Sequence, residues 1–351
     1  MPARSLDAHP RATALTARDL SKAYGDRVVL DGVDLTATPG VPLGVVGENG
    51  SGKSTLLRLL AGEDRPDAGD VVRPPDLGHL PQHPGFRAGA TVADVLDGAL
   101  APLHHAAGRL ARLGEALASS DDPARADEYA DLLGWCVLHD VWDADRRTAE
   151  AAARLGLAAV DRATPVAALS GGERSRLALA ALVVRRPACL LLDEPTNHLD
   201  DDATDFLEGL VATLPGVVVV ASHDRTFLQK ACRRLLDVDP ALPTGSGRSL
   251  VGARFTGTYT DFLAAKAAER RRWVEAYEAQ CQELDRLRST AATTARRVAP
   301  GRPPRDNDKF VHHAKGQNVA RTVRRRVRDA ERRIDSLEAA RVPRPPRPLS
   351  L

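Results

Sequence analysis

Apolar and polar residues alternate along the N-terminal part of the chain. Residues 12–36 contain the segments ATALTARDLSKAY and RVVLDGVDLT, and alternation of this kind is typical of strands that bury one face. We therefore predict a short antiparallel strand pair, with Tyr24 at the turn between its strands. A turn tyrosine either stacks on a purine base or is simply exposed, and its position alone favours neither reading.

Continuous apolar runs predict strands of a second kind. One run is Leu43–Val46, another lies within ACLLLDEP (residues 188–195), and a third lies within GVVVVASHD (residues 216–224). Runs without alternation suit parallel strands that are buried on both faces. Ligands bind at the carboxyl ends of such strands, so the residues that follow each run are candidates for chemistry.

Helical periodicity fills two other parts of the chain. Residues 91–119 and 123–155 are rich in Ala and Leu at helical spacing, and SSDDP between them supplies turn and helix-start residues. We interpret them as a helical subdomain inserted into an α/β fold. Two further apolar stripes near the C-terminus predict an antiparallel helical hairpin, with arms of roughly 30 residues and about 45 Å. The stripes are Trp273, Tyr277, Cys281, Leu284 and Leu287, then Val319, Val323, Ala330, Ile334 and Leu337.

Composition narrows the class of protein. The 351 residues are enough for two domains. No apolar run approaches the ~20 residues that span a bilayer, so we expect no membrane insertion. The N-terminus lacks the apolar segment of a secretory signal. Four scattered cysteines show no disulfide or metal-ligand spacing, and we expect a cytoplasmic location.

Charge is distributed unevenly. The net charge is +2, yet residues 262–351 carry 22 basic and 11 acidic side chains, a local excess of +11 that leaves −9 for residues 1–261. A charge run is usually a solvated face, but an excess of one sign on a long hairpin also suits phosphate contact with RNA. The candidate RNA-contacting residues are Arg321, Arg324, Arg325 and Arg328.

The stretch after the first apolar run carries the clearest chemistry. In GENGSGKST, Gly47, Gly52, Lys53 and Ser54 fit the phosphate-loop pattern. Glycines allow several N–H groups to point into one anion-sized nest, at the positive end of the following helix. Lys53 would neutralise the β- and γ-phosphates and Ser54 would be a magnesium ligand. A glycine-rich turn that binds nothing would explain neither side chain.

Three later segments add candidate groups. Ser170 and Glu173 form a predicted capping box, and Gly171 and Gly172 leave that helix N-terminus open to an anion. Asp193 would hold magnesium and Glu194 would polarise the water that attacks the γ-phosphate. His223 is predicted at the same sheet edge, where a neutral imidazole would orient that water; taken alone, it is an ordinary loop histidine.

Taken together and in this order, these segments resemble an ATP-binding cassette (ABC) ATPase. GENGSGKST resembles the Walker A loop, LPQ the Q-loop, LSGGE the family signature, LLLDEP Walker B, NHLD the D-loop and SHD the switch histidine. The resemblance implies ATP and Mg²⁺, with Tyr24 stacking on adenine and Gln82 contacting magnesium or water. It implies that Ser170, Gly171, Gly172 and Glu173 act in trans, on ATP held by a second cassette or by a homodimer partner. The ATP-binding residues are then Tyr24, Gly47, Glu48, Asn49, Gly50, Ser51, Gly52, Lys53, Ser54, Thr55 and Gln82, the metal ligands Ser54, Gln82 and Asp193, and the catalytic residues Glu194 and His223.

Further segments narrow the resemblance to the ABC-F class. DEPTNHLD, SHDRTFL and RFTGTYTDFL are similar to that class, with Phe255, Gly257 and Tyr259 in its pattern before an interdomain linker. The expected fold is α/β, a P-loop ABC ATPase fold with an antiparallel β subdomain and an inserted helical arm, followed by a long α-helical hairpin. Its expected parts are an ATP-binding domain at 12–255 with the arm at about 91–155, a basic hairpin linker at 256–341 and a Pro-rich tail at 342–351.

The ABC-F resemblance implies an ATPase that acts on the ribosome, contacting rRNA and P-site tRNA, in antibiotic resistance or translation regulation. A second cassette is expected after the linker in that class, and the sequence stops at residue 351 without one. Two alternatives stay open: the ATP-binding subunit of an exporter, and a truncated cassette that binds nucleotide without hydrolysing it.

Overall fold

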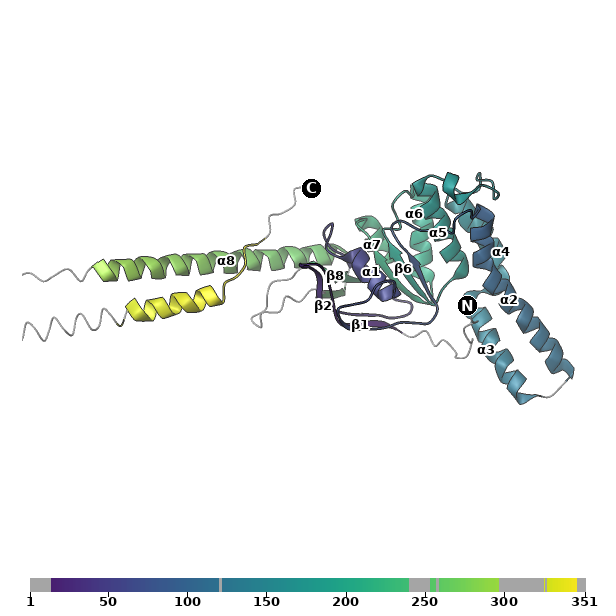
Figure 1. Cartoon of the computed structure of the whole chain (residues 1–351), viewed down its shortest axis with the longest axis horizontal. Coiled ribbons are helices and arrows are strands. Elements are labelled where there is room, and N and C mark those ends of the chain that lie inside the picture. Colours follow the sequence, from purple (N-terminus) through teal and green to yellow (C-terminus); the bar gives the residue numbers. More distant parts are fainter. Residues whose placement is uncertain are drawn as a thin grey trace, which may run out of the picture. The chain divides into compact units, whose positions relative to one another are not determined.

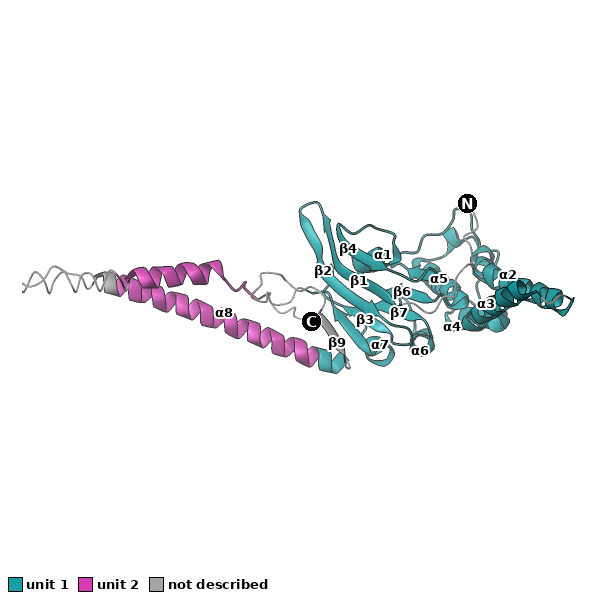
Figure 2. Ribbon diagram, turned by 90° about the horizontal axis from the view of Figure 1, so that it is seen from below, with its two compact units in different colours: residues 1–241, 249–262 teal, residues 242–248, 263–351 magenta. Residues whose placement is uncertain are grey.

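The computed structural model describes residues 14–119, 122–239, 253–256, 259–296, 325 and 327–345, with side chains omitted for 253–256 and 294–296. Several predicted features lie outside this description: residues 12–13, the Phe255 side chain, Gly257 and residues 346–351 of the tail. So do Val319, Arg321, Val323 and Arg324 of the hairpin. The chain forms two compact units, residues 1–241 with 249–262 (unit 1) and residues 242–248 with 263–351 (unit 2), drawn in teal and magenta in Figure 2.

Unit 1 contains two sheets. Strands β1 (Leu15–Tyr24), β2 (Arg27–Ala37) and β4 (Ala68–Val72) form an antiparallel sheet in the order β2-β1-β4. The predicted N-terminal strand pair is therefore confirmed. The second sheet has the order β5-β6-β7-β3-β8-β9 and is parallel except for its β8–β9 pair. Its strands are β3 (Leu43–Val46), β5 (Leu77–Leu80), β6 (Cys189–Asp193), β7 (Val217–Ala221), β8 (Arg234–Asp237) and β9 (Ala253–Thr256).

Both faces of the parallel sheet are buried, as its continuous apolar runs predict. Successive side chains of a strand point to opposite faces, so β6 and β7 contribute to two separate cores. Leu191 and Val219 pack with helix α1 (Lys53–Ala61) and the antiparallel sheet, whereas Leu190 and Leu192 pack with the helices of the other face. Those helices include α5 (Gly171–Arg185), α6 (Asp201–Thr213) and α7 (Arg225–Ala231), as Figure 1 shows.

The predicted arm projects from this layered core as the antiparallel helices α2 (Val92–Ser119) and α3 (Pro123–His139), which lie side by side in Figure 1. Asp122 accepts the amide of Ala124 at 3.1 Å and caps α3, with Pro123 in the first turn. The helical periodicity over 123–155 belongs to two helices rather than one. Asp140 adopts a left-handed conformation (φ 49°) and ends α3, and a 3-10 turn (Val141–Asp143) leads into α4 (Ala144–Arg154).

Arg147 connects the turn between α3 and α4 to the rest of unit 1. Its side chain is 7% exposed, and its Nη2 donates to the carbonyls of His139 and Val184, both at 3.1 Å. Its Nη1 donates to the Asp140 carboxylate at 2.9 Å. Because Val184 belongs to α5, the arginine ties the base of the arm to that helix.

The described part of unit 2 contains the long helix α8 (Tyr259–Arg296), whose first turn belongs to unit 1, and a second helical segment at residues 327–339. Gln280 on α8 donates to the carbonyls of Leu337 and Ala340 and accepts the amide of Val342. Arg288 on α8 pairs with Glu338 at 2.7 Å. The predicted hairpin is thus present over its described residues.

Replacing Arg147 with alanine should lower the free energy of unfolding by about 2–4 kcal/mol, because the carbonyls of His139 and Val184 lose a buried donor, whereas Asp140 keeps its pairing with Arg186. Arg146→Ala is the matched control, since Arg146 lies on the same helix, is 66% exposed and pairs only with exposed acids. The control should change stability by less than about 1 kcal/mol. Urea unfolding followed by circular dichroism checks both, and equal losses would contradict the role of Arg147.

Candidate functional site

Three neighbouring strands bring the candidate residues to one edge of the parallel sheet. Strands β6, β7 and β3 are adjacent and parallel. Asp193 ends β6, His223 follows β7, and Gly47 follows β3. The phosphate-loop pattern, the two acids and the histidine therefore meet, although up to 176 positions separate them along the 351-residue chain.

The loop after β3 folds around the Lys53 ammonium. Lys53 donates to the carbonyls of Gly47 and Glu48 at 2.9 and 3.0 Å. The Glu48 amide donates to the Asp239 carboxylate at 2.7 Å, which supports the loop from behind. Burial leaves Lys53 7% exposed and lowers its pKa, an effect that nearby carboxylates, Glu194 foremost, oppose. A buried ammonium whose hydrogen bonds go to backbone carbonyls is suited to receive an anion.

Gly52 explains why this turn needs glycine. Its φ is 103°, and a Cβ at this position would lie 2.9 Å from side-chain carbons of both Val29 and Leu30. Gly52 precedes α1 and provides no side-chain cap, so the first N–H groups of α1 remain available to a ligand.

Asp193 and Glu194 lie in unusual surroundings for acids. Asp193 is 4% exposed, and its Oδ1 has no hydrogen-bond partner. Glu194 has a φ of 49°, and its amide donates to the Ala221 carbonyl at 2.8 Å. Its Oε2 accepts the His223 amide at 3.1 Å, and its Oε1 lies 3.4 Å from His223 Nε2. Burial raises the pKa of Glu194, and the His223 amide opposes that shift.

A cavity of about 490 Å³ lies over this edge, within the usual range of ligand pockets. Ten of the residues named from the sequence line it: Tyr24, Asn49, Gly50, Gly52, Lys53, Ser54, Thr55, Gln82, Glu194 and His223. Gly47, Glu48, Ser51 and Asp193 are not among its lining residues.

The signature residues lie elsewhere and do not line this cavity. Ser170 caps α5 by accepting the Glu173 amide at 3.2 Å, while the Glu173 carboxylate accepts the Ser170 amide at 2.8 Å. The predicted capping box is confirmed. Gly171 begins α5, and a Cβ on it would meet no atom within 4 Å. The N-terminus of α5 is therefore open at Gly171, whereas a Cβ on Gly172 would lie 3.2 Å from the Cβ of His198.

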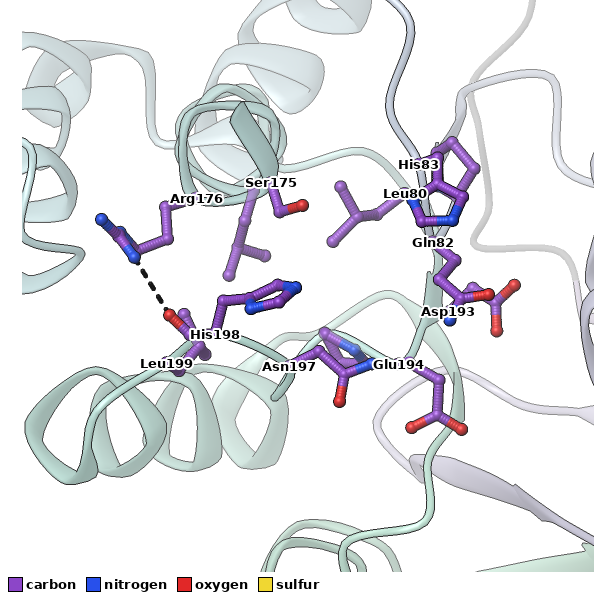
Figure 3. A pocket seen from close by; sticks show the side chains of 13 residues that line it. Leu80, Gln82, His83, Ser175, Arg176, Asp193, Glu194, Asn197, His198 and Leu199 are labelled. Atoms are coloured by element: carbon purple, nitrogen blue, oxygen red, sulfur yellow. Dashed lines mark hydrogen bonds between the residues drawn. The ribbon is translucent and has the colours of Figure 1, made fainter. Parts of the chain in front are cut away.

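A second cavity of about 40 Å³ lies behind the two acids (Figure 3). Gln82, Glu194 and Asn197 line both cavities, whereas Asp193 lines only this one. Figure 3 shows Arg176 of α5 reaching the His198 carbonyl, at 3.0 Å. The helix that carries the signature is thus joined to the loop after Glu194.

Sequence reasoning missed Arg27, Val29 and Asn197, which also line the larger cavity. Arg27 and Val29 belong to β2, where alternation predicts an ordinary strand, and only their nearness to Tyr24 in sequence hints at a ligand. Asn197 stands within the NHLD segment, so the motif could have indicated it. No cluster of three or more His, Cys, Asp or Glu suited to a metal occurs among the described residues.

A phosphate loop at the carboxyl edge of a parallel sheet, beside buried acids and a histidine, defines a nucleotide-binding ATPase domain of the P-loop kind. The ABC transporter family model matches residues 30–197. A solved structure titled as the ATP-binding subunit of an ABC transporter matches at 19% identity with a TM-score of 0.50, over 70% of this chain and 90% of that one, and confirms the predicted fold.

Curated relatives narrow the class. Tylosin resistance ATP-binding protein TlrC of Streptomyces fradiae is 42% identical over 97% of this chain and 62% of its own length. Energy-dependent translational throttle protein EttA of Mycobacterium tuberculosis is 35% identical over 72% of this chain and 44% of its own length. The chain belongs to the ABC-F family of ATP-binding cassette proteins. It spans roughly half the length of these relatives, and no helix in the described part of the chain is both long and apolar enough to cross a membrane.

Replacing Glu194 with glutamine should stabilise the protein without nucleotide at neutral pH. The Glu194 side chain is 10% exposed, and its Oε1 lacks a hydrogen-bond partner. A neutral isostere removes the cost of burying the charge, and the thermal midpoint should rise by about 2–4 °C. Glu208→Gln is the control, because Glu208 is equally buried but pairs with Lys230 at 2.8 Å, and it should bring no gain. A Glu194→Gln protein that melts below wild type would contradict this account of the site.

Proposed function

We propose that this chain binds ATP with Mg²⁺ in the 490 Å³ cavity, hydrolyses ATP together with a second cassette, and acts on the ribosome in antibiotic resistance or translation regulation. The observation that carries the nucleotide part is the convergence of Tyr24, Lys53, Glu194 and His223 on one cavity. These residues offer an aromatic surface for a base, a cation for phosphates and two groups for proton handling.

In this proposal each end of the cavity has its own task. Lys53 exchanges its contacts with the loop carbonyls for the β- and γ-phosphates, and the amides at the start of α1 hold the same phosphates. Residues 47–55, the loop and the first residues of α1, provide these contacts. At the other end Tyr24, which is 45% exposed, stacks on the adenine ring.

The residues present fit a magnesium ion. The unpartnered Oδ1 of buried Asp193 is the kind of oxygen that a hard cation takes. Asp193, Ser54 and Gln82 would hold the ion, Asp193 directly or through water. Bound Mg²⁺ supplies charge neutralisation at the phosphate oxygens.

Glu194 and His223 supply the chemistry of the chain itself. Glu194 accepts a proton from the attacking water, a role suited to a carboxylate whose pKa burial has raised. His223 orients that water and contacts the γ-phosphate, while its backbone amide holds the Glu194 carboxylate in place.

We place the signature residues Ser170, Gly171, Gly172 and Glu173 on ATP held by another cassette. The open N-terminus of α5 supports this, because it lies away from the cavity of its own chain. The partner is a second cassette in trans or, in a head-to-tail homodimer, another copy of this chain.

Exposed basic side chains of unit 2 support ribosome binding. On residues 327–339 the apolar positions Ile334 and Leu337 are half-buried, whereas Arg328, Arg332 and Arg333 are exposed. The same segment also exposes four acids, and it is the described part of unit 2 as a whole (residues 263–296, 325 and 327–345) that carries a positive excess, with 13 basic and 9 acidic side chains. That sign suits rRNA and P-site tRNA phosphates, and Arg325 is a further exposed candidate. The names of the two relatives, which describe tylosin resistance and a translational throttle, agree with this target.

We further propose a cytoplasmic location and the domain division 12–255, 256–341 and 342–351. The alternative of an exporter subunit rests on the fold alone, since the fold is common to many ATP-binding subunits.

The Glu194→Gln variant should co-sediment with ribosomes in the presence of ATP at least roughly tenfold more than wild type, because unhydrolysed ATP retains the bound state. Adding Arg328→Gln, Arg332→Gln and Arg333→Gln to it should reduce that binding by roughly tenfold, because phosphate contacts and their counterion release are lost.

The control replaces Arg125, Arg146 and Arg162, which are 48%, 66% and 57% exposed in unit 1, with glutamine in the same Glu194→Gln background. It removes the same charge from the arm and its surroundings and should retain most of the binding. Equal sedimentation of all the variants would contradict ribosome contact by unit 2, and co-purification with an integral membrane protein would favour the exporter alternative.

A further inference from the structure

The hydroxyl of Tyr24 is held by a residue outside every motif named above. It donates to Asp64 Oδ2 at 2.7 Å. Asp64 lies in the loop that follows α1, the helix that begins at Lys53, and its side chain is 18% exposed. The ring therefore has a fixed tilt although nearly half of the residue faces solvent.

Asp64 is itself held from several directions. Lys22 donates to Asp64 Oδ1 at 3.1 Å, and Arg58 lies 3.3 Å from Oδ2. The Arg65 amide donates to Oδ1 at 2.7 Å. These contacts, led by the Tyr24 hydroxyl, lower the pKa of Asp64 to about 2, so the carboxylate stays ionised and keeps accepting.

Lys22 completes the arrangement from the ring side. Its ammonium lies 5.3 Å from the centroid of the Tyr24 ring, within the range of a cation–π contact. Lys22 also donates to the Arg65 carbonyl at 2.7 Å. Lys22 thus contacts one face of the Tyr24 ring, and Asp64 accepts a hydrogen bond from its hydroxyl.

We propose that Asp64 is a positioning residue for the nucleoside base: it fixes the Tyr24 ring against the wall of the cavity and couples that ring to the phosphate-binding helix α1. The proposal rests on the nucleotide binding proposed above and deepens it. Since the Tyr24 hydroxyl donates its proton to Asp64, Tyr24 offers the base its aromatic face and no hydrogen-bond donor.

The coupling has a physical basis in the chain itself. Asp64 comes two residues after Gly62, the C-cap of α1, and the Asp64 amide lies 3.4 Å from the Arg58 carbonyl of that helix. Helix α1 therefore positions both the phosphates, which bind at its start, and the base, which stacks on Tyr24. If the Tyr24 ring were free to rotate, binding would have to order it, and the entropic cost would offset part of the stacking energy.

The test measures the affinity of the full-length protein for Mg-ATP and for Mg-tripolyphosphate, which lacks a base, by calorimetry. Asp64→Asn should weaken Mg-ATP binding by about three- to tenfold, the size of one lost charge-assisted hydrogen bond, and leave tripolyphosphate binding unchanged. Tyr24→Phe, which keeps the ring but not the hydroxyl, should do the same. The double variant should lose less than the product of the two single losses.

Asp70→Asn is the matched control, because Asp70 is an exposed acid on the nearby strand β4, and it should bind both ligands as wild type does. Equal weakening of both ligands by Asp64→Asn, or losses that multiply in the double variant, would show that Asp64 only supports the fold and would overturn the proposal. Failure of wild type to bind either ligand would instead overturn the proposed function.

Discussion

The burial of charge at the carboxyl edge of the parallel sheet is the constraint on which this site depends. Lys53 and Asp193 are almost fully buried there, and Glu194 stands beside them in a left-handed backbone conformation. Such groups are costly without full sets of partners. Apolar packing on both faces of the sheet offsets this cost in free energy. One face packs against α1 and the antiparallel sheet, and the other packs against α5, α6 and α7.

The same constraint links the site to more distant parts of unit 1. Arg176 joins α5 to the loop after Glu194 through the His198 carbonyl, and Arg147 joins α5 to the base of the arm through the Val184 carbonyl. The loop after Glu194 and the base of the arm are therefore both joined to α5, by an exposed contact at His198 and a buried one at Val184. These contacts are to backbone carbonyls, so they fix the position of whole elements rather than of single side chains.

Much of this fold can be predicted from the sequence, because many of its elements are specified by short stretches of consecutive residues. An apolar run predicts strand β3, the phosphate-loop pattern predicts the glycine-rich turn, and the helix that follows the turn is α1. The capping box at Ser170 needs only four consecutive residues. The break at Asp140 could not be predicted in this way, since the corner is stabilised by Arg147 and by a carbonyl of α5. Likewise, Asp64 touches Tyr24 across 40 positions of the chain, and a turn aspartate carries no local sign of such a partner.

Hydrolysis at a site shared between two cassettes is the central claim, and the rate of Mg-ATP hydrolysis per molecule, measured over a series of protein concentrations, tests it most directly. Turnover per molecule should rise with concentration as two copies meet head to tail, and Glu194→Gln should lower it by roughly a hundredfold or more. Turnover that stays at background at every concentration, or that Glu194→Gln leaves unchanged, would contradict the account.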